Sequence, residues 1–452
     1  MMAHILTGDD TITMSVKFLL KDIPDKLSVS ESQIRMALRQ KKYVAKWILL
    51  NFMDSNTALV SVRVPRKSKN IDFTINVQGH TVKAIKLSSV EEEEFELALN
   101  SSTAKMFSSI STLRQVVEEA ITEMKHVEKC DMFQGRVGDI KYDLQKSTSK
   151  SYEIYPFGSR VAGLGFKHSD YDVFIDMGGY YRGGGETHRS NSVQYIRDLI
   201  RQVKTFTDPI LIPRARVPVL KVKHRTTGIQ CDISTLNGIG VENTNLLRNY
   251  MSDSRVRFVA TGVKVWARQL GLTQAGVGPG SITSYCMLWL VIFALMQDCP
   301  PAAPSVVAVK QSCKGSNLFI DGWDCSFCNS PVPKLKNNKS EIELLIHFFS
   351  FYGSMTIPDI TSNVISPFLG KMIPVKEFVK TNSLPNEFEN YKKQARSDRF
   401  YEMRCDSAMC VQDPVEQGHN IAKTVEDWVV DRFLKLCKTT TTLVENSMSP
   451  HV

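Results

Sequence analysis

The first ninety residues contain short apolar runs separated by polar turns, a pattern typical of a small sheet. The runs predict strands at 16–23, 45–52, 58–64, 73–77 and 82–87, with a helix at 28–39 that begins in a serine-rich stretch. The acidic run at 91–94 reads as the solvated start of a helix. A linker between domains is therefore expected near 88–100.

Helical spacing dominates the rest of the chain. Apolar residues at Ile110, Leu113, Val117, Ile121 and Met124 predict a helix within 104–130. Further helices are expected at 192–204, 256–270 (ended by Gly271) and 285–297, and a hairpin is expected from strands at 217–223 and 229–234. The glycine-rich segment 178–190 reads as a mobile connection.

Composition changes this picture little. The 452 residues suggest two or three domains, and the net charge of +9 is compatible with a polyanionic partner. Ten scattered cysteines fit a reducing compartment. The longest apolar run, at 285–296, is too short to cross a membrane, and the N-terminus resembles neither a signal nor an ordinary transit peptide. We expect an intracellular protein of the cytoplasm or nucleus, with the mitochondrion left open.

The most informative stretch is 157–176, which reads FGSRVAGLGFKHSDYDVFID. Asp170 and Asp172 are two residues apart on a predicted strand, so their carboxylates face the same side. Asp232 lies in the second strand of the predicted hairpin, as either a buried structural acid or a third member of the set. Paired carboxylates are typical of Mg²⁺ or Mn²⁺ sites in which substrate phosphates supply further ligands.

Three such acids predict nucleotidyl transfer by in-line displacement at two divalent ions. Asp232 would be a base or ligand for the attacking 3′-hydroxyl, and Ser159 after Gly158 can donate to phosphate oxygens. A P-loop is excluded because Gly165 is not followed by Lys-Ser/Thr, and a dinucleotide fingerprint would need glycine in place of His168.

Downstream residues suggest a nucleotide site. Lys264 and Arg268 are four residues apart on a helix, so both project from one face, as a phosphate clamp or as two solvated cations. Ser284 and Tyr285 open the most apolar helix, where a hydroxyl can reach phosphate and a tyrosine can stack on a base. A tyrosine that only fills the core is the alternative.

Together these motifs resemble the non-templated RNA nucleotidyltransferases of polymerase-β type, which comprise terminal uridylyltransferases and non-canonical poly(A) polymerases. The resemblance covers roughly 113–434. It implies that Asp170, Asp172 and Asp232 are the catalytic acids. It further implies nucleotide contacts by the following residues: Gly158, Ser159, Asn243, Thr244, Lys264, Arg268, Ser284, Tyr285, Asp413 and His419.

The implied fold is α/β plus α. A polymerase-β-like nucleotidyltransferase palm is expected at 96–245, a helical poly(A)-polymerase-associated domain at 246–437, and a disordered tail at 438–452. Residues 1–95 weakly resemble the α+β RNA-recognition motif, but Leu19, Thr57 and Leu59 stand where its stacking aromatics would be. This unit is therefore expected to contact a protein partner or only RNA backbone.

The segment 411–420, VQDPVEQGHN, carries the choice of base. In the resembled uridylyltransferases, a histidine at the position of His419 lies against uracil and crowds out adenine. UTP is therefore the expected nucleotide, and single-stranded RNA 3′ ends, bound beside Arg214, Arg216, Lys221 and Lys223, are the expected acceptors. A poly(A) polymerase, a template-free oligoadenylate synthetase and an RNA-binding scaffold are the alternatives. Three segments read as variable or disordered additions, 180–189, 313–328 and the tail from 439; Cys313, Cys325 and Cys328 leave a zinc hypothesis open.

Overall fold

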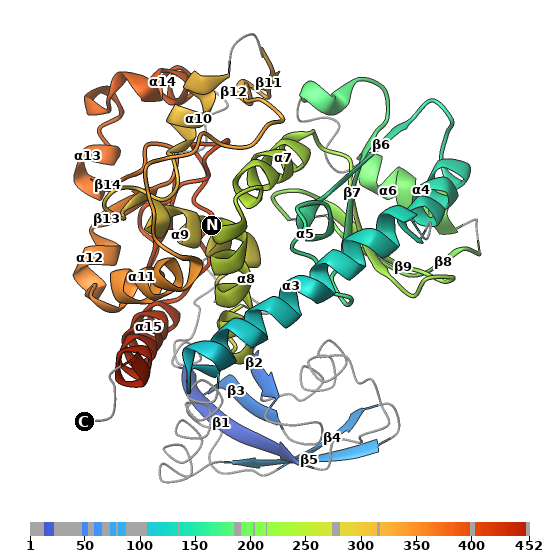
Figure 1. The fold of residues 1–452 in the computed structure, drawn as a ribbon. Coiled ribbons are helices and arrows are strands. Elements are labelled where there is room, and N and C mark those ends of the chain that lie inside the picture. Colours follow the sequence, from blue (N-terminus) through green and yellow to red (C-terminus); the bar gives the residue numbers. More distant parts are fainter. Residues whose placement is uncertain are drawn as a thin grey trace, which may run out of the picture.

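The computed structural model describes residues 13–21, 48–52, 58–65, 73–77, 80–86, 106–133, 136–184, 191–201, 204–213, 215–273, 281–313, 317–397 and 403–448. Figure 1 shows a palm built on a sheet, a helical domain beside it and a separate N-terminal sheet. Among the described residues, no helix combines the length and the apolar character needed to cross a membrane.

The N-terminal sheet is antiparallel throughout. Its strands are β1 (Thr13–Lys21), β2 (Ile48–Phe52), β3 (Ala58–Pro65), β4 (Phe73–Val77) and β5 (His80–Lys86), in the order β2-β3-β1-β5-β4. All five expected strands are present, with ends shifted by a few residues. The expected helix at 28–39 and the linker at 88–100 lie outside the described residues. The resemblance to an RNA-recognition motif therefore stays a prediction.

Two helices lead into the palm, α3 (Ile110–Phe133) and α4 (Arg136–Ser147). Leu113, Val117 and Met124 are buried as the helical spacing predicts, whereas Ile110 is exposed because it opens the helix. The sequence pattern did not predict α4. Its buried residues Ile140 and Leu144 pack against the palm sheet.

The palm sheet is mixed. Its strands are β6 (Glu153–Phe157), β7 (Tyr171–Asp176), β8 (Phe206–Ile212), β9 (Val219–His224) and β10 (Gln230–Ser234), in the order β6-β7-β10-β9-β8. Only β7 and β10 run parallel, and the expected hairpin is β9–β10. On one face Tyr171, Val173 and Ile175 pack with α4 and α6 (Asn191–Arg201), so Asp172, with the opposite parity, faces away from this core.

The helical domain encloses the largest core of the molecule. Its helices are α7 (Ile239–Met251), α8 (Ser254–Gln269), α9 (Ser284–Met296), α10 (Val306–Ser312), α11 (Glu341–Gly353), α12 (Ile357–Thr361), α13 (Val375–Phe378), α14 (Glu389–Ala395) and α15 (Asp427–Met448). Short strands pair as β11 (Phe319–Ile320) with β12 (Trp323–Asp324), and as β13 (Asn363–Ser366) with β14 (Lys371–Pro374) and β15 (Cys410–Val411).

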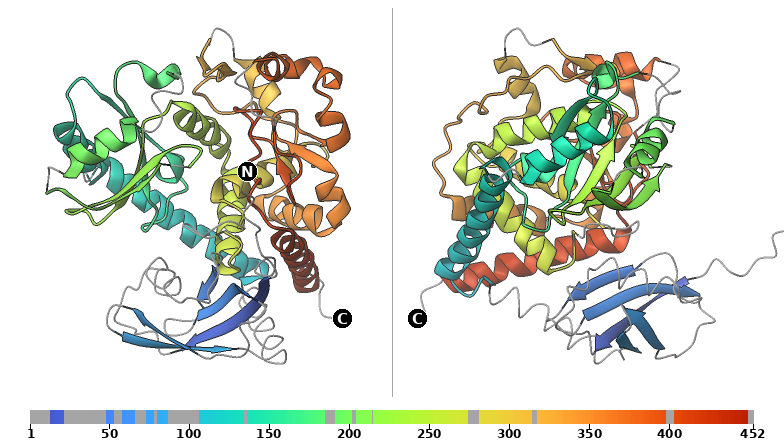
Figure 2. Two further views of the ribbon diagram at one scale, coloured as in Figure 1. Left: turned by 180° about the vertical axis from the view of Figure 1, so that it is seen from behind. Right: turned by 90° about the vertical axis from the view of Figure 1, so that its right-hand side faces the viewer.

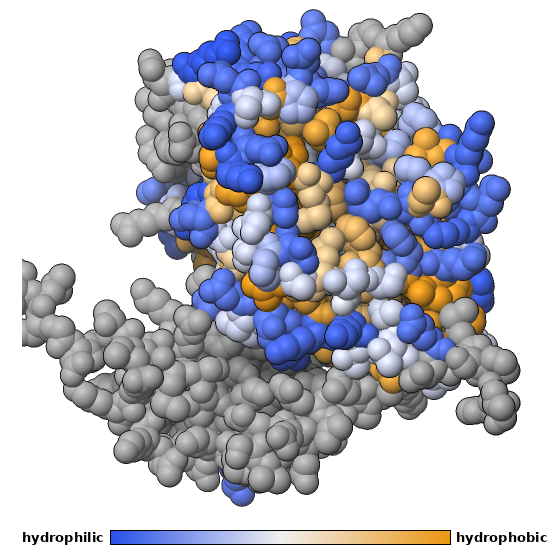
Figure 3. Space-filling model, turned by 90° about the vertical axis from the view of Figure 1, so that its left-hand side faces the viewer, coloured by the Kyte–Doolittle hydropathy of each residue, from blue (hydrophilic) through white to orange (hydrophobic). Residues whose placement is uncertain are grey.

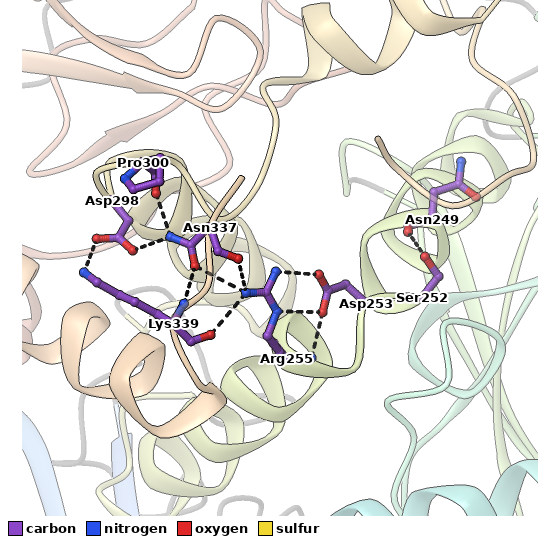
Figure 4. Close-up of polar contacts among 8 residues, drawn as sticks. All are labelled: Asn249, Ser252, Asp253, Arg255, Asp298, Pro300, Asn337 and Lys339. Atoms are coloured by element: carbon purple, nitrogen blue, oxygen red, sulfur yellow. Dashed lines mark hydrogen bonds and ion pairs between the residues drawn. The ribbon is translucent and has the colours of Figure 1, made fainter. Parts of the chain in front are cut away.

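A polar network joins α8 to the chain that enters α11 (Figure 4). The buried amide of Asn337 donates to Asp298 Oδ2 at 2.8 Å and to the Pro300 carbonyl at 2.6 Å. Arg255 donates from α8 to the carbonyls of Asn337 and Lys339. Burial alone would raise the pKa of Asp298, but hydrogen bonds from Lys339 and Asn337 hold it below its usual value. The network therefore fixes the helices that carry the site described below.

The structure corrects the expectation of a disordered tail. α15 continues to Met448 and lies along α11, as the right-hand view of Figure 2 shows at the base of the helical domain. Thr440 is fully buried, and its hydroxyl accepts a hydrogen bond from Trp266 Nε1 at 3.1 Å. Tertiary packing therefore overrides the weak helix propensity of the threonine run 439–442.

The segments expected to be variable additions are also partly ordered. The short helix η1 (Tyr180–Arg182) contacts β11, and the Asp321 amide donates to the Arg182 carbonyl at 3.0 Å. Cys325 is buried within the core of the helical domain. Figure 3 draws the face that lies on the left in Figure 1, where hydrophobic patches lie between hydrophilic residues.

Candidate active site

A tight turn after β6 opens the site. Gly158 has a φ of 79°, and a Cβ atom there would lie 1.9 Å from Asp172 Oδ2, so only glycine lets the turn approach this carboxylate. The amide of Gly158 donates to Thr244 Oγ1 at 2.8 Å, and the Thr244 hydroxyl donates to the Gly240 carbonyl at 2.8 Å. The turn, which continues into the short helix α5 (Gly158–Val161) through Ser159, is thus fixed to α7.

Two neighbouring strands bring the three acids together. Asp172 on β7 pairs in register with Asp232 on β10, and Asp170 lies just before β7. Burial, followed by repulsion from Asp232 and Asp170, raises the pKa of Asp172 to about 8. Burial and then Asp232 also raise the pKa of Asp170. The acids therefore share one electrostatic environment, as the sequence predicts.

The donor set fits a divalent cation by its chemistry. Carboxylates are hard oxygen ligands, and Asp232 Oδ1 is buried without a hydrogen-bond partner. As the side chains lie, however, no three His, Cys, Asp or Glu residues in the described ranges form a metal-binding group. At the triad, Lys221 Nζ contacts Asp232 Oδ2 at 2.5 Å and lies 3.9 Å from Asp170 Oδ2.

The same finding bears on the zinc hypothesis. The Cys328 amide donates to Cys313 Sγ at 2.7 Å, while Cys325 is buried in the core. These three cysteines do not form a metal-binding group in the described structure.

A buried arginine that the sequence did not flag supports Asp170. Arg160 donates to the Ser169 carbonyl at 2.8 Å and to the Lys167 carbonyl at 2.9 Å, and its guanidinium is held by both carboxylate oxygens of Asp131 on α3. The Arg160 side chain is only 4% exposed. Because Ser169 directly precedes Asp170, these hydrogen bonds from the Arg160 guanidinium hold the segment that leads into β7. A signal did exist, since a charged residue inside a glycine-rich turn must find a partner.

Lys264 and Arg268 do project from one face of α8, and both lie over Phe166, at 5.2 and 5.8 Å from its ring centroid. Lys264 Nζ donates to the Leu164 carbonyl at 2.5 Å, and Arg268 contacts His168. Burial, then the charge of Arg268, lowers the pKa of Lys264 to about 8. The reading of two solvated cations is therefore wrong for Lys264.

The residues expected around the base converge from two parts of the helical domain. The Tyr285 hydroxyl on α9 donates to Asp413 Oδ2 at 3.2 Å, and His419 Nδ1 lies 3.9 Å from the same oxygen. Asp413 Oδ1 accepts the amides of Val415 and Glu416, both at 2.9 Å. His419 Nδ1 is buried without a hydrogen-bond partner.

Three further residues expected to contact the nucleotide lie on α7 and α9. Ser284 is exposed at the first turn of α9, where Thr283 rather than Ser284 caps the helix. On α7, Asn243 Oδ1 is buried and has no hydrogen-bond partner. Thr244 instead supports the glycine turn, so its hydroxyl is committed to the protein.

An ion pair links this loop to the palm. Arg216, between β8 and β9, lies 2.5 Å from Glu416 Oε2. Arg214, also expected in the cleft, lies outside the described residues. Lys223 on β9 is exposed.

Residues 99–252 match a family described as "Poly(A) RNA polymerase, mitochondrial-like, central palm domain". The chain is 26% identical over 473 residues to the Speckle targeted PIP5K1A-regulated poly(A) polymerase of Danio rerio, covering 91% of this chain and 57% of that protein. It is 25% identical over 303 residues to Terminal uridylyltransferase 4 of Mus musculus, covering 65% of this chain and 16% of that protein. The chain thus spans only part of either relative.

Two solved structures share the fold. The Cid1 poly(U) polymerase with bound MgGTP aligns with a TM-score of 0.56 at 23% identity, over 75% of this chain and 95% of that chain. The mtPAP complex with ATPγS aligns with a TM-score of 0.57 at 21% identity, over 94% of this chain and 91% of that chain. These two structures confirm the polymerase-β-like fold. The palm-domain match and the curated relatives confirm the family resemblance, and the names of the relatives include both poly(A) polymerase and terminal uridylyltransferase.

The buried hydrogen bonds of the Arg160 guanidinium predict a large and specific loss of stability when this side chain is replaced. Replacing Arg160 with Met should lower the free energy of unfolding by roughly 3 kcal/mol, because Asp131 and two carbonyls lose their partner. Arg160→Lys should recover less than half, since an ammonium cannot reproduce the planar fork. Chemical denaturation measures both.

Arg197→Met is the matched control, because Arg197 pairs with the half-exposed Asp198 on the surface of α6. Such a pair contributes at most about 1 kcal/mol. Equal losses for Arg160→Met and Arg197→Met would contradict the assignment of a buried supporting role to Arg160.

Lys264 predicts a pH dependence of stability. Its pKa of about 8 in the folded protein lies below that of an exposed lysine, so the unfolded chain binds more protons and stability should rise as pH increases from about 8 to 10.5. Lys264→Met should remove this rise and be more stable than the unsubstituted protein at pH 7. Thermal melts between pH 7 and 10.5 test this, with Lys223→Met as the exposed control; parallel curves for Lys264→Met and the unsubstituted chain would refute it.

Proposed function

We propose that this chain, which belongs to the family of non-canonical poly(A) polymerases and terminal uridylyltransferases, adds uridylate from UTP to the 3′ ends of single-stranded RNA without a template. The observation that carries the reaction type is the register of β7 and β10, which places Asp172 beside Asp232 with Asp170 close by. We further propose an intracellular setting for this activity.

Asp170, Asp172 and Asp232 would hold Mg²⁺ or Mn²⁺. A bound pair of such ions lowers the pKa of an attacking hydroxyl and neutralises charge on the triphosphate. Asp232, with its unpartnered Oδ1, is the acid best placed to ligate or deprotonate the 3′-hydroxyl. Arg160 keeps the segment that leads to Asp170 in place.

The triphosphate would lie between the glycine turn and α8. Ser159 follows Gly158 in that turn, and Lys264 reaches the carbonyl of Leu164 a few residues further on. Because burial destabilises the protonated form of Lys264, an anionic phosphate nearby would stabilise its charge and raise its pKa. Arg268 on the same face of α8 and Ser284 at the start of α9 would complete the phosphate contacts, and the unpartnered Asn243 Oδ1 would accept from the ribose.

The choice of UTP rests on His419. An imidazole N–H at this place can donate to the 4-oxygen of uracil, whereas adenine would present an amine donor there. Asp413 would accept from the N3–H of uracil, next to the 4-oxygen, while Tyr285 stacks against the base. A mismatched polar pair in such a pocket costs about 1–3 kcal/mol. ATP use, and hence a poly(A) polymerase, is the competing outcome of the test below.

The acceptor RNA would approach past Arg216, Lys221 and Lys223 along the β8–β9 side of the palm, with contacts to phosphates that weaken as salt increases. The N-terminal unit, 1–95, would act as a separate RNA-backbone or protein-binding module beside the palm (96–245) and the helical domain (246–437).

Asp172 separates enzymatic function from stability. Asp172→Asn should reduce nucleotide transfer by at least about a hundredfold, because it removes a ligand of the proposed metal site. The same change should raise the melting temperature in EDTA, since it removes a buried acid that Asp170 and Asp232 repel. Primer-extension assays and thermal melts measure the two effects.

Asp176→Asn, on the same strand, is the control with the opposite expectation. Its carboxylate accepts the amides of Gly178, Tyr180 and Tyr181, so the change should lower the melting temperature. An Asp172→Asn protein that retains full transfer activity would refute the metal-binding role of Asp172, whereas an unsubstituted chain without transfer activity would favour a scaffold.

His419→Ala tests base choice. The ratio of UTP to ATP incorporation into a short RNA should fall about tenfold, corresponding to roughly 1.4 kcal/mol. His126→Ala on α3, where the imidazole forms a hydrogen bond with Cys130, should leave the ratio unchanged. An unsubstituted enzyme that prefers ATP, or an unaltered ratio in His419→Ala, would show that the base assignment is wrong.

A further inference from the structure

Lys221 places a positive charge inside the acidic cluster. It lies on β9, in register with Asp232 on the antiparallel neighbour β10. Its ammonium is 2.5 Å from Asp232 Oδ2 and 3.9 Å from Asp170 Oδ2. The side chain is 37% exposed, so its ammonium can leave the cluster without unfolding the strand.

The neighbouring lysine shows that this contact is specific. Lys223 is two residues further along β9 and therefore on the same face, opposite Gln230. In the described part of the chain it makes no ion pair with an acid. The two lysines thus share a strand, a face and a charge, and differ in that Lys221 reaches the triad.

The ammonium binds the same atoms that a divalent ion would need. Three carboxylates at one place repel one another, and Lys221 supplies one positive charge against them. Asp232 Oδ1 nevertheless keeps no hydrogen-bond partner, so one ammonium does not satisfy the set. The contact stabilises the cluster without completing it.

We propose that Lys221 is a resident counter-ion that couples metal binding to nucleotide binding, an inference that rests on the proposed nucleotidyltransferase function. An ion that binds alone must displace or repel the ammonium. When a nucleoside triphosphate binds as well, its phosphate oxygens give the displaced ammonium a new partner. Lys221 therefore weakens metal binding to the free enzyme more than metal binding to the nucleotide complex.

The expected size of this coupling follows from charge. Removing one positive charge beside an incoming divalent ion favours its binding, and solvent exposure reduces the size of the effect. We therefore expect Lys221→Met to tighten Mn²⁺ binding to the nucleotide-free protein about tenfold. Binding in the presence of nucleotide should change far less, so the coupling factor should fall towards one. Coupling of this kind is reciprocal, so bound Mn²⁺ should strengthen nucleotide binding less in Lys221→Met than in the unsubstituted chain.

The experiment measures Mn²⁺ dissociation constants by electron paramagnetic resonance and calorimetry, with and without a non-hydrolysable α,β-imido analogue of UTP or of ATP. The proteins are the unsubstituted chain, Lys221→Met, Lys221→Arg and the control Lys223→Met. Lys221→Arg should retain most of the coupling because it keeps the charge, and Lys223→Met should retain all of it. None of these readouts requires turnover.

The outcomes separate the inference from the proposed function. Coupling between Mn²⁺ and nucleotide binding that is lost in Lys221→Met but kept in Lys221→Arg and Lys223→Met supports the inference. This holds for the UTP analogue and for the ATP analogue. Mn²⁺ that binds the unsubstituted chain equally well with and without both analogues overturns it, even if Lys221→Met does not fold. Coupling that survives unchanged in folded Lys221→Met also overturns it, while leaving nucleotidyl transfer in place. Failure of the chain to bind Mn²⁺ under any condition would overturn the proposed function and the inference together.

Discussion

The parallel pairing of β7 with β10 is the constraint on which the site depends. It sets Asp172 and Asp232 side by side, and the two-residue period of a strand adds Asp170 on the same face. Holding these acids together costs stability, because burial and then repulsion between the acids raise the pKa values of Asp170 and Asp172. The surrounding structure must therefore hold the acids together against their own charges.

Several groups supply that restraint, and they come from distant parts of the chain. Arg160 fixes the carbonyls before Asp170 and is itself held by Asp131 on α3. Gly158 lets the turn close over Asp172, and Thr244 ties that turn to α7. Lys264 on α8 donates to the loop that follows. The palm and the helical domain are thus joined through the same few residues that would bind the nucleotide.

The sequence could predict the local parts of this arrangement. Periodicity placed α8, α9 and the β9–β10 hairpin within a few residues, because each has strong apolar spacing and clear ends. It did not predict that α15 continues past 438, because the helical conformation there depends on the burial of Thr440 and on its hydrogen bond from Trp266. The role of Arg160 also escaped, because Asp131 is 29 positions away in the sequence. The family resemblance grouped Tyr285, Asp413 and His419 around the base, whereas the hydrogen bond from Tyr285 to Asp413 required the structure.

One partly exposed ion pair, Arg216–Glu416, connects the loop proposed to contact the base with the palm strands beside the acids. The loop from Val411 carries both Asp413 and His419, and Asp413 Oδ1 is committed to the amides of Val415 and Glu416. The carboxylate of Glu416 in turn pairs with Arg216, which precedes β9 and therefore Lys221. A shift of the palm strands that moved Arg216 would therefore strain or break this ion pair. In the proposed enzyme the base pocket and the acids would thus be linked through this pair, and a misplaced base would strain that link as well as lose its own hydrogen bonds.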